Sequence, residues 1–247
     1  MGIDENSPFF ANLSAPTTAE ETKSSSTPTS PSKPKEVALK KIRKSTSREG
    51  GVDFTVLREI KFLGELQHPN VISLYDVFFH KYSIYLALEY APTDLDKLLK
   101  DKSISLEERD IRGIFRQILE GMIFLHSQFV LHRDLKPSNV LVSRDGLLKF
   151  ADFGMARLFG TPREFTKGVV TLWYRAPELL YGASYYGPAV DMWSVGCIFA
   201  EVLMREPIFP GSSEIDQLSK IFAILGPATD ETWPGVSTLP NYLPFIC

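Results

Sequence analysis

Apolar residues follow no regular pattern over the first 34 residues of the chain, and they become periodic only after that point. Residues 1–34 are rich in Ser, Thr and Pro, and their few large apolar side chains include Phe9, Phe10 and Leu13. A segment of this composition cannot bury enough surface to offset the entropy that is lost on ordering. We therefore predict a disordered tail over residues 1–34 and a folded domain over residues 35–247.

The first part of the predicted domain contains the signals of a small sheet. Residues 36–42 ("EVALKKI") predict a strand, and residues 70–79 and 83–90 are β-rich runs separated by the polar "HKY", as in a hairpin. Between the strand over residues 36–42 and the run over residues 70–79, an apolar residue recurs every three positions, as on one face of a helix. Those residues are Phe54, Leu57, Ile60 and Leu63.

The second part of the chain predicts mostly helices. Ser105 and Glu108 have the spacing of a capping box, and apolar residues at helical spacing follow them. Residues 139–150 predict a short hairpin that turns at "DG". Two further helices, one apolar on most faces and one amphipathic, are predicted over residues 189–204 and 214–225. Because strands lead and helices follow, we predict an α+β fold with a small sheet lobe and a larger helical lobe.

Composition limits the possible functions. The chain has 247 residues, of which 44% are apolar, and its formal net charge of −3 does not indicate a surface dedicated to nucleic acid or membrane. It has no basic-then-apolar leader and no apolar run of about eighteen residues. Cys197 and Cys247 form no spaced framework. We expect a protein of the nucleus, the cytoplasm or both, which contacts neither nucleic acid nor membrane directly.

One string carries the strongest chemical signal, "HRDLKPSNVLV" at residues 132–142. It is followed by "DFG" at residues 152–154 and "APE" at residues 176–178, and it is preceded by "VALK", which ends at Lys40. Each short motif has little weight alone, whereas their common order and spacing match the protein-kinase signature set. The sequence therefore resembles the eukaryotic protein kinases.

The resemblance covers residues 35–247 and implies a bilobal protein-kinase fold. Residues 35–91 would form part of the sheet-containing N-lobe and the hinge, and residues 92–247 part of the helical C-lobe. The resemblance also implies ATP and Mg²⁺ as nucleotide and metal. Phosphoryl transfer requires positioning and charge neutralisation more than covalent chemistry, and Mg²⁺ prefers oxygen ligands.

The resemblance assigns roles to the catalytic residues. Asp152 and Asn139 would hold Mg²⁺. Asp134 would orient the substrate hydroxyl or accept its proton, and Lys136 would contact the γ-phosphate. Thr171 would bond to the catalytic loop. Each residue alone could instead be a surface charge or a turn cap, but that alternative requires all of them to be present by accident.

Lys40 would bind the α- and β-phosphates while it is paired with a carboxylate on the predicted helix. Glu59 is the favoured partner and Glu65 is its rival. The resemblance further implies an adenine and ribose site with Leu88 as gatekeeper and a hinge over residues 89–91. Its residues would be Ala38, Leu88, Glu89, Ala91, Asp94 and Leu141.

Longer strings narrow the resemblance to the cyclin-dependent kinases. They are "FTVLREIKFLGELQHPNVI" and "VVTLWYRAPELLYGASYYGPAVDMWSVGCIFAEVL", while "FGTPREFTKGVVT" and "TLPNYLPF" are most similar to the CDK-activating kinase subgroup. The resemblance implies phosphorylation of protein substrates at Ser/Thr-Pro, with Arg175 shaping a pocket for the proline, and roles in the cell cycle or transcription. It also implies a cyclin-type subunit that grips the helix beginning at Phe54 and ending at Leu66.

An activation-segment phosphosite is implied as well. Thr166 is the matching position and Thr161 is a possible second one. A phosphate there requires an arginine cluster, and three arginines occupy the matching places. They are Arg58, Arg133 and Arg157.

The sequence departs from the family at both ends. Gly2 is the only glycine before Gly50, so no glycine-rich loop precedes Lys40, and we expect the first two strands of the sheet to be absent. The family's last helices would follow Cys247, including the arginine that pairs with the glutamate matching Glu178. We therefore expect a kinase truncated at both ends. The alternative is an inactive kinase-fold module that binds or sequesters a cyclin; a P-loop NTPase is excluded because the chain has no GxxxxGK[ST] motif.

Overall fold

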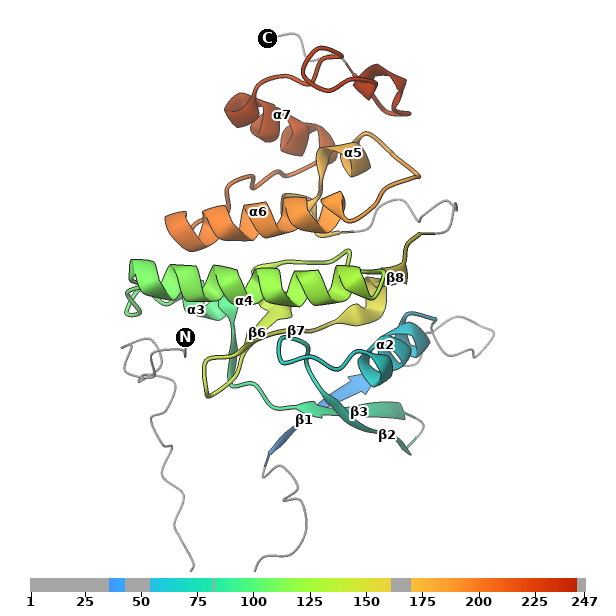
Figure 1. Ribbon diagram of the computed structural model, residues 1–247, viewed down its shortest axis with the longest axis vertical. Coiled ribbons are helices and arrows are strands. Elements are labelled where there is room, and N and C mark those ends of the chain that lie inside the picture. Colours follow the sequence, from blue (N-terminus) through green and yellow to red (C-terminus); the bar gives the residue numbers. More distant parts are fainter. Residues whose placement is uncertain (1–35, 43–53, 82, 161–169, 244–247) are drawn as a thin grey trace, which may run out of the picture.

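A computed structural model describes residues 36–42, 54–81, 83–160 and 170–243 of the chain. Its sheet and one helix form a small lobe at one end, and stacked helices form a larger lobe at the other (Figure 1). The predicted tail and the candidate phosphosites, Thr161 and Thr166, lie outside the described residues. Within those residues no helix is both long and apolar enough to cross a membrane.

The small lobe contains an antiparallel three-stranded sheet in the order β1-β3-β2. Its strands are β1 (Val37–Ile42), β2 (Leu74–His80) and β3 (Ser83–Glu89). Exposed and half-buried residues alternate along β1, and Lys40 lies on the half-buried face opposite Leu86 of β3. In the described part of the chain β1 is an edge strand of this sheet.

Helix α2 (Phe54–Glu65) packs beside this sheet (Figure 1), but only the second half of the apolar stripe that the sequence indicated, Ile60 and Leu63, turns towards the core. Phe54 is 78% exposed and Leu57 is 49% exposed. The buried residues are Val56, Glu59, Phe62 and Leu63. The buried face contains a carboxylate because Glu59 is paired with Lys40, and hydrophobic periodicity cannot register such an ion pair.

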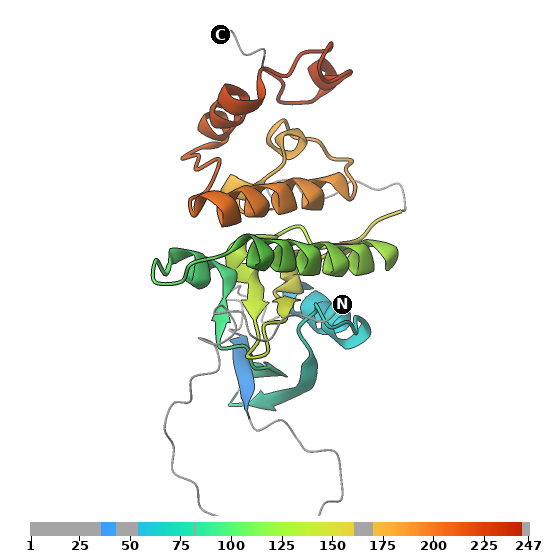
Figure 2. The ribbon, with the colours of Figure 1, turned by 60° about the vertical axis from the view of Figure 1, so that its left-hand side comes forward.

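The large lobe is built on two long helices, α4 (Glu108–Ser127) and α6 (Ala189–Met204). They lie one above the other in both ribbon views (Figures 1 and 2), and the rings of Phe115 and Phe199 meet between them at a centroid distance of 4.1 Å. The predicted capping box is wrong by two residues. The N-cap is Glu107 and its reciprocal partner is Asp110, because α4 begins at Glu108 rather than at residue 106.

Shorter elements surround these helices. The predicted hairpin over residues 139–150 is present as β6 and β7, and the predicted helix over residues 214–225 is present as α7 with Gly226 as its C-cap. The remaining helices and strands had no clear sequence signal. All the shorter elements, those that were predicted and those that were not, are β4 (Thr93–Asp94), α3 (Leu95–Lys100), β5 (Val130–Leu131), β6 (Val140–Val142), β7 (Leu148–Phe150), β8 (Arg157–Leu158), α5 (Pro177–Leu180) and α7 (Glu214–Leu225).

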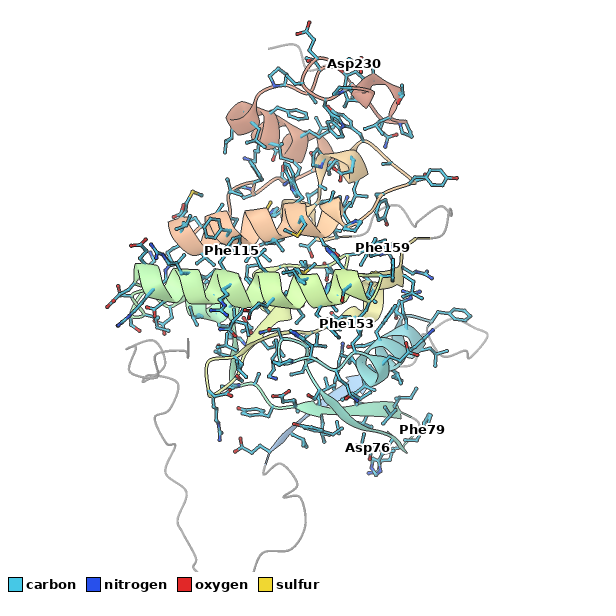
Figure 3. All side chains as sticks on the ribbon, in the orientation of Figure 1. Asp76, Phe79, Phe115, Phe153, Phe159 and Asp230 are labelled. Atoms are coloured by element: carbon cyan, nitrogen blue, oxygen red, sulfur yellow. The ribbon has the colours of Figure 1, made fainter. Side chains whose placement is uncertain are left out.

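A continuous apolar core runs through both lobes. Phe62 of α2, Phe153 after β7 and Met122 of α4 are buried in it, and it extends to Ile198 of α6 and Leu218 of α7. Figure 3 places Phe153 between α2 and α4, where the two lobes meet. The segment that begins at Asp152 is therefore fixed from both lobes.

Candidate active site

Lys40 and Glu59 form an ion pair that joins β1 to α2. The Lys40 Nζ lies 2.7 Å from Glu59 Oε1 and 3.3 Å from Asp152 Oδ1, so the structure pairs Lys40 with Glu59, the partner favoured over Glu65. Burial alone would lower the pKa of Lys40, but attraction to Glu59 and Asp152 outweighs it and holds the pKa above its usual value. Lys40 is therefore a fixed positive charge beside Asp152.

Asp134 lies at the centre of a hydrogen-bond network. Its Oδ1 accepts from Thr171 Oγ1 at 2.8 Å, and its Oδ2 lies 2.9 Å from Lys136 Nζ. Lys136 also donates to Thr171 Oγ1 at 3.0 Å, and the Asn139 amide donates to the backbone carbonyl of Asp134 at 2.8 Å. The structure thus brings together the four residues that the sequence proposed as catalytic.

Asp191, which is buried at the start of α6, supports the backbone of this loop. Its carboxylate accepts from the backbone N–H groups of His132 and Arg133, both at 2.9 Å. Arg133 has φ = 64°, in the left-handed region that a non-glycine residue rarely adopts. The two charge-assisted hydrogen bonds to Asp191 offset this strain, and they fix the backbone from which the Asp134 side chain projects.

Asp152 and Asn139 have the chemistry of a magnesium site. Asp152 also has φ = 64°, and its side chain is 49% exposed, while Phe153 beside it is fully buried. The Asn139 amide nitrogen is committed to Asp134, so its amide oxygen is the atom that can face a metal. Among the described residues no group of three His, Cys, Asp or Glu side chains could hold a metal by itself. The Asp152 carboxylate and the Asn139 amide oxygen fit Mg²⁺, because this ion takes its other oxygen ligands from phosphates and water.

The predicted adenine residues lie along the junction of the lobes. Ala38 of β1 faces Leu88 of β3 in the strand register, and Leu141 lies on β6, paired with Lys149 of β7. Leu88 and Leu141 are partly buried against the core. The Asp94 side chain is the N-cap of α3, where it accepts a hydrogen bond from the backbone N–H of Lys97. Ala91 is half-buried in the segment between β3 and β4.

Two of the three predicted phosphate-binding arginines hold the segment after Asp152. Arg58 of α2 donates to the carbonyl of Gly154 at 2.7 Å, and Arg133 donates to the carbonyl of Met155 at 2.8 Å. Arg157 lies close enough to influence Arg133 electrostatically. Burial is the main cause that lowers the pKa of Arg133, so its guanidinium needs these acceptors.

The sequence did not identify Tyr186 as part of this region. Its hydroxyl accepts a hydrogen bond from Arg133 Nη1 at 2.8 Å. Tyr186 lies 53 residues from Arg133 in the sequence, in a segment without helix or strand periodicity. No local pattern could have shown the contact.

Arg175 binds the carbonyl of Val170, the residue before Thr171. Its Nη2 donates to Val170 O at 2.9 Å and its Nη1 lies 2.6 Å from Glu214 Oε1. Val170 has φ = 70°, which is strained for a β-branched residue. The left-handed backbone turns its carbonyl towards Arg175.

Comparison with known proteins shows the family to which the chain belongs. The protein kinase domain model matches residues 27–244 of the chain. The chain therefore belongs to the protein kinase family, and the predicted α+β fold with a sheet-containing N-lobe and a helical C-lobe is confirmed.

Within that family the chain is similar to cyclin-dependent kinase 7. The proteins of that name from Dictyostelium discoideum, Xenopus laevis and Caenorhabditis elegans are 51%, 51% and 52% identical to it over 213, 212 and 210 residues. These alignments cover 84–85% of this chain and 59%, 60% and 64% of the relatives, so the chain spans about three fifths of their length. A chain from the CAK complex of Chaetomium thermophilum, bound to ATP-γ-S, has a TM-score of 0.80 and 44% identity, covering 84% of this chain and 66% of its own.

Proposed function

We propose that the protein is a Ser/Thr protein kinase of the cyclin-dependent type, which transfers the γ-phosphoryl group of ATP to a protein hydroxyl. The observation that carries the proposal is the position of Asp134, held by Thr171, Lys136 and Asn139 in the loop whose backbone Asp191 supports. The family, the similarity to cyclin-dependent kinase 7 and a neighbouring structure that binds ATP-γ-S support it.

The chemistry of Asp134 follows from its surroundings. The substrate oxygen attacks the γ-phosphorus, its proton passes to Asp134, and the bond to the ADP oxygen breaks. Lys136 is bonded to Asp134 and to Thr171, so its ammonium group is positioned to neutralise charge on the transferred phosphoryl group. These residues supply orientation and charge rather than a covalent intermediate.

Lys40, Asn139 and Asp152 would position the nucleotide. Asn139 and Asp152 would hold Mg²⁺, which when bound neutralises the phosphate oxygens. Lys40 would bind the α- and β-phosphates from its ion pair with Glu59. The adenine would lie against Ala38, Leu88 and Leu141, with the hinge at Glu89 and Ala91 and the ribose near Asp94.

Arg175 supports a preference for proline after the phosphorylated residue. Because the Val170 carbonyl already accepts from Arg175 Nε and Nη2, it does not face the substrate as a hydrogen-bond acceptor. A substrate residue with a backbone N–H would leave that donor unpaired, whereas proline has none. We therefore propose Ser/Thr-Pro sites in protein substrates.

A cyclin-type subunit would bind α2. Phe54 and Leu57 expose apolar surface on the face of α2 that does not pack into the core. Movement of this helix would also move Glu59, which pairs with Lys40, and Arg58, which holds Gly154. Phosphorylation at Thr166, with Thr161 as a second site, would engage Arg58, Arg133 and Arg157. We place this activity in the nucleus or cytoplasm, in cell-cycle or transcriptional control.

The proposal is tested by phosphate transfer from Mg·ATP to paired peptides that contain Ser-Pro or Ser-Ala, with a recombinant cyclin that binds cyclin-dependent kinase 7. We expect transfer to the Ser-Pro peptide, and we expect Asp134→Asn to reduce it by at least about 100-fold, as removal of a general base does. Nucleotide and cyclin binding without any transfer would contradict the proposal and favour the inactive module.

A further inference from the structure

Lys149 is a buried lysine in β7 to which the mechanism above gives no role. Its side chain is 8% exposed, and its Nζ lies 3.0 Å from Glu89 Oε1 and 3.0 Å from the carbonyl oxygen of Pro69, to which it donates. A charge at such a site is stable only when it is paired and hydrogen-bonded. Lys149 therefore depends on both contacts, and both partners come from other segments of the chain.

These contacts join three segments. Lys149 belongs to the strand that leads to Asp152, Glu89 ends β3 at the start of the hinge, and Pro69 lies in the loop between α2 and β2. Backbone hydrogen bonds also join the loop between α2 and β2 to the other two segments. Ile72 N donates to Phe150 O at 3.0 Å and Glu89 N donates to Ser73 O at 2.9 Å.

The contacts of Lys149 connect the two ends of the proposed nucleotide site. Glu89 is the first residue of the hinge on which the adenine would lie, and its carboxylate points to Lys149 rather than to solvent. Asp152, which would hold the metal at the phosphates, follows Lys149 by three residues in the same segment. The Lys149–Glu89 pair thus links the adenine end of the site to the metal end.

We propose that Lys149 is a positioning residue that sets the distance between the hinge and Asp152 for Mg·ATP. This inference rests on the nucleotide site proposed above. A ligand that reaches only the hinge does not depend on this distance, whereas a ligand that contacts the hinge and Asp152 together does. Lys149 contacts neither ligand itself.

The test compares adenosine with Mg·ATP. In the full chain we replace Lys149 by Met, which keeps the length and apolar stem of the side chain but removes the charge, and we measure both affinities by calorimetry. We expect Mg·ATP to bind about tenfold more weakly or worse, as for a misplaced catalytic group, while adenosine binding changes less than about twofold. The matched control is Lys100→Met, which removes an exposed lysine paired with Asp96 and should change neither affinity.

Two further variants separate positioning from general stability. Lys149→Arg retains the charge and its donors and should restore most of the Mg·ATP affinity. Lys149→Gln, which removes the charge but keeps a hydrogen-bond donor, should weaken Mg·ATP selectively, and it replaces the Met variant in the test if that variant does not fold. Equal losses for adenosine and Mg·ATP, or no loss for either ligand, would overturn the inference.

Hydrogen exchange provides a readout that does not depend on nucleotide. In Lys149→Met the amides of Ile72 and Glu89, which bridge the three segments, should exchange faster, while the amides that pair β2 with β3 between Leu74–Leu88 and His80–Ser83 should not. If the wild-type chain binds no nucleotide, the proposed function fails, and exchange still decides whether Lys149 fixes these segments. Unchanged exchange at Ile72 and Glu89 would then reject the positioning role.

Discussion

Several charged side chains in this protein are held by only two or three hydrogen-bond partners, and Arg175 is one whose contacts lead to a prediction about substrate choice. Its guanidinium bonds both the Val170 carbonyl and Glu214, and a lysine cannot make this set of contacts.

We predict that Arg175→Lys lowers the ratio of kcat/KM values for Ser-Pro over Ser-Ala peptides by about tenfold, because an unpaired polar group costs about 1–3 kcal/mol. Arg112→Lys, on an exposed arginine of α4 paired with Glu108, is the control and should leave the ratio unchanged. An unaltered ratio in Arg175→Lys would show that proline selection arises elsewhere.

Glu178 is a second residue whose environment gives a testable consequence. Burial raises the pKa of its carboxyl group, so the folded state binds the proton more tightly than the unfolded state. The resulting contribution to stability is fully present below the unfolded pKa and is lost as the pH rises through the higher folded pKa. In the described part of the chain no ion pair to Glu178 is present to reverse this trend.

We therefore predict that Glu178→Gln becomes more stable relative to the wild type as the pH rises from about 4 to 8, values that bracket the usual range for Glu. Denaturant unfolding at several pH values measures this difference. Glu231→Gln, at an exposed position, should show little dependence on pH. A constant difference for Glu178→Gln would mean that its carboxylate acquires a compensating partner.

At the scale of helices, α4 offers two glycines with opposite surroundings. A Cβ at Gly121 would lie 2.6 Å from Phe150 Cε2 and 3.0 Å from Asn70 Cβ, whereas a Cβ at Gly113 meets nothing within 4 Å. Gly121 is therefore the point at which α4 approaches β7 and the loop before β2.

We predict that Gly121→Ala destabilises the protein by about 1–3 kcal/mol through overpacking. Gly113→Ala should stabilise it by up to about 1 kcal/mol through helix propensity. Urea unfolding of the two variants gives both values. Stabilisation by both alanines would show that α4 and β7 are less closely packed than the structure indicates.

Helix α2 gives the corresponding prediction for partner binding. Phe54→Ser and Leu57→Ser remove exposed apolar surface, so they should weaken binding of the cyclin by about tenfold or more, as interface anchors do, without lowering stability. Ile123→Ser, at a 70% exposed site on α4, is the control. Binding by surface plasmon resonance that is equally strong in all three variants would exclude α2 as the contact.

The elements that the sequence predicted best are those with strong, long periodicity. The ends of α6 and α7 agree with their apolar patterns, and the motif residues Asp134, Asn139 and Thr171 could be selected before their contacts were known. Helix α3, with six residues, is too short for periodicity to identify. The Lys149–Glu89 pair and the Arg133–Tyr186 bond join residues far apart in the sequence, and local patterns contain no information about such contacts.

At the scale of the whole molecule, the two lobes meet where Lys40, Asp134 and Asp152 lie. Lys40 comes from the sheet, Asp134 from the loop after β5, and Asp152 from the segment after β7, so the site exists only when both lobes are folded against each other. The buried Phe153 and the Lys149 contacts fix that arrangement.

The most direct test of this account is Mg²⁺-dependent binding of ATP to the full chain, measured by calorimetry. We predict saturable binding in the presence of Mg²⁺ that is weakened at least about tenfold by Asp152→Asn, as for loss of a metal ligand, and left intact by Lys100→Met. The absence of saturable binding by the folded wild-type chain, or equal binding by Asp152→Asn, would contradict the account.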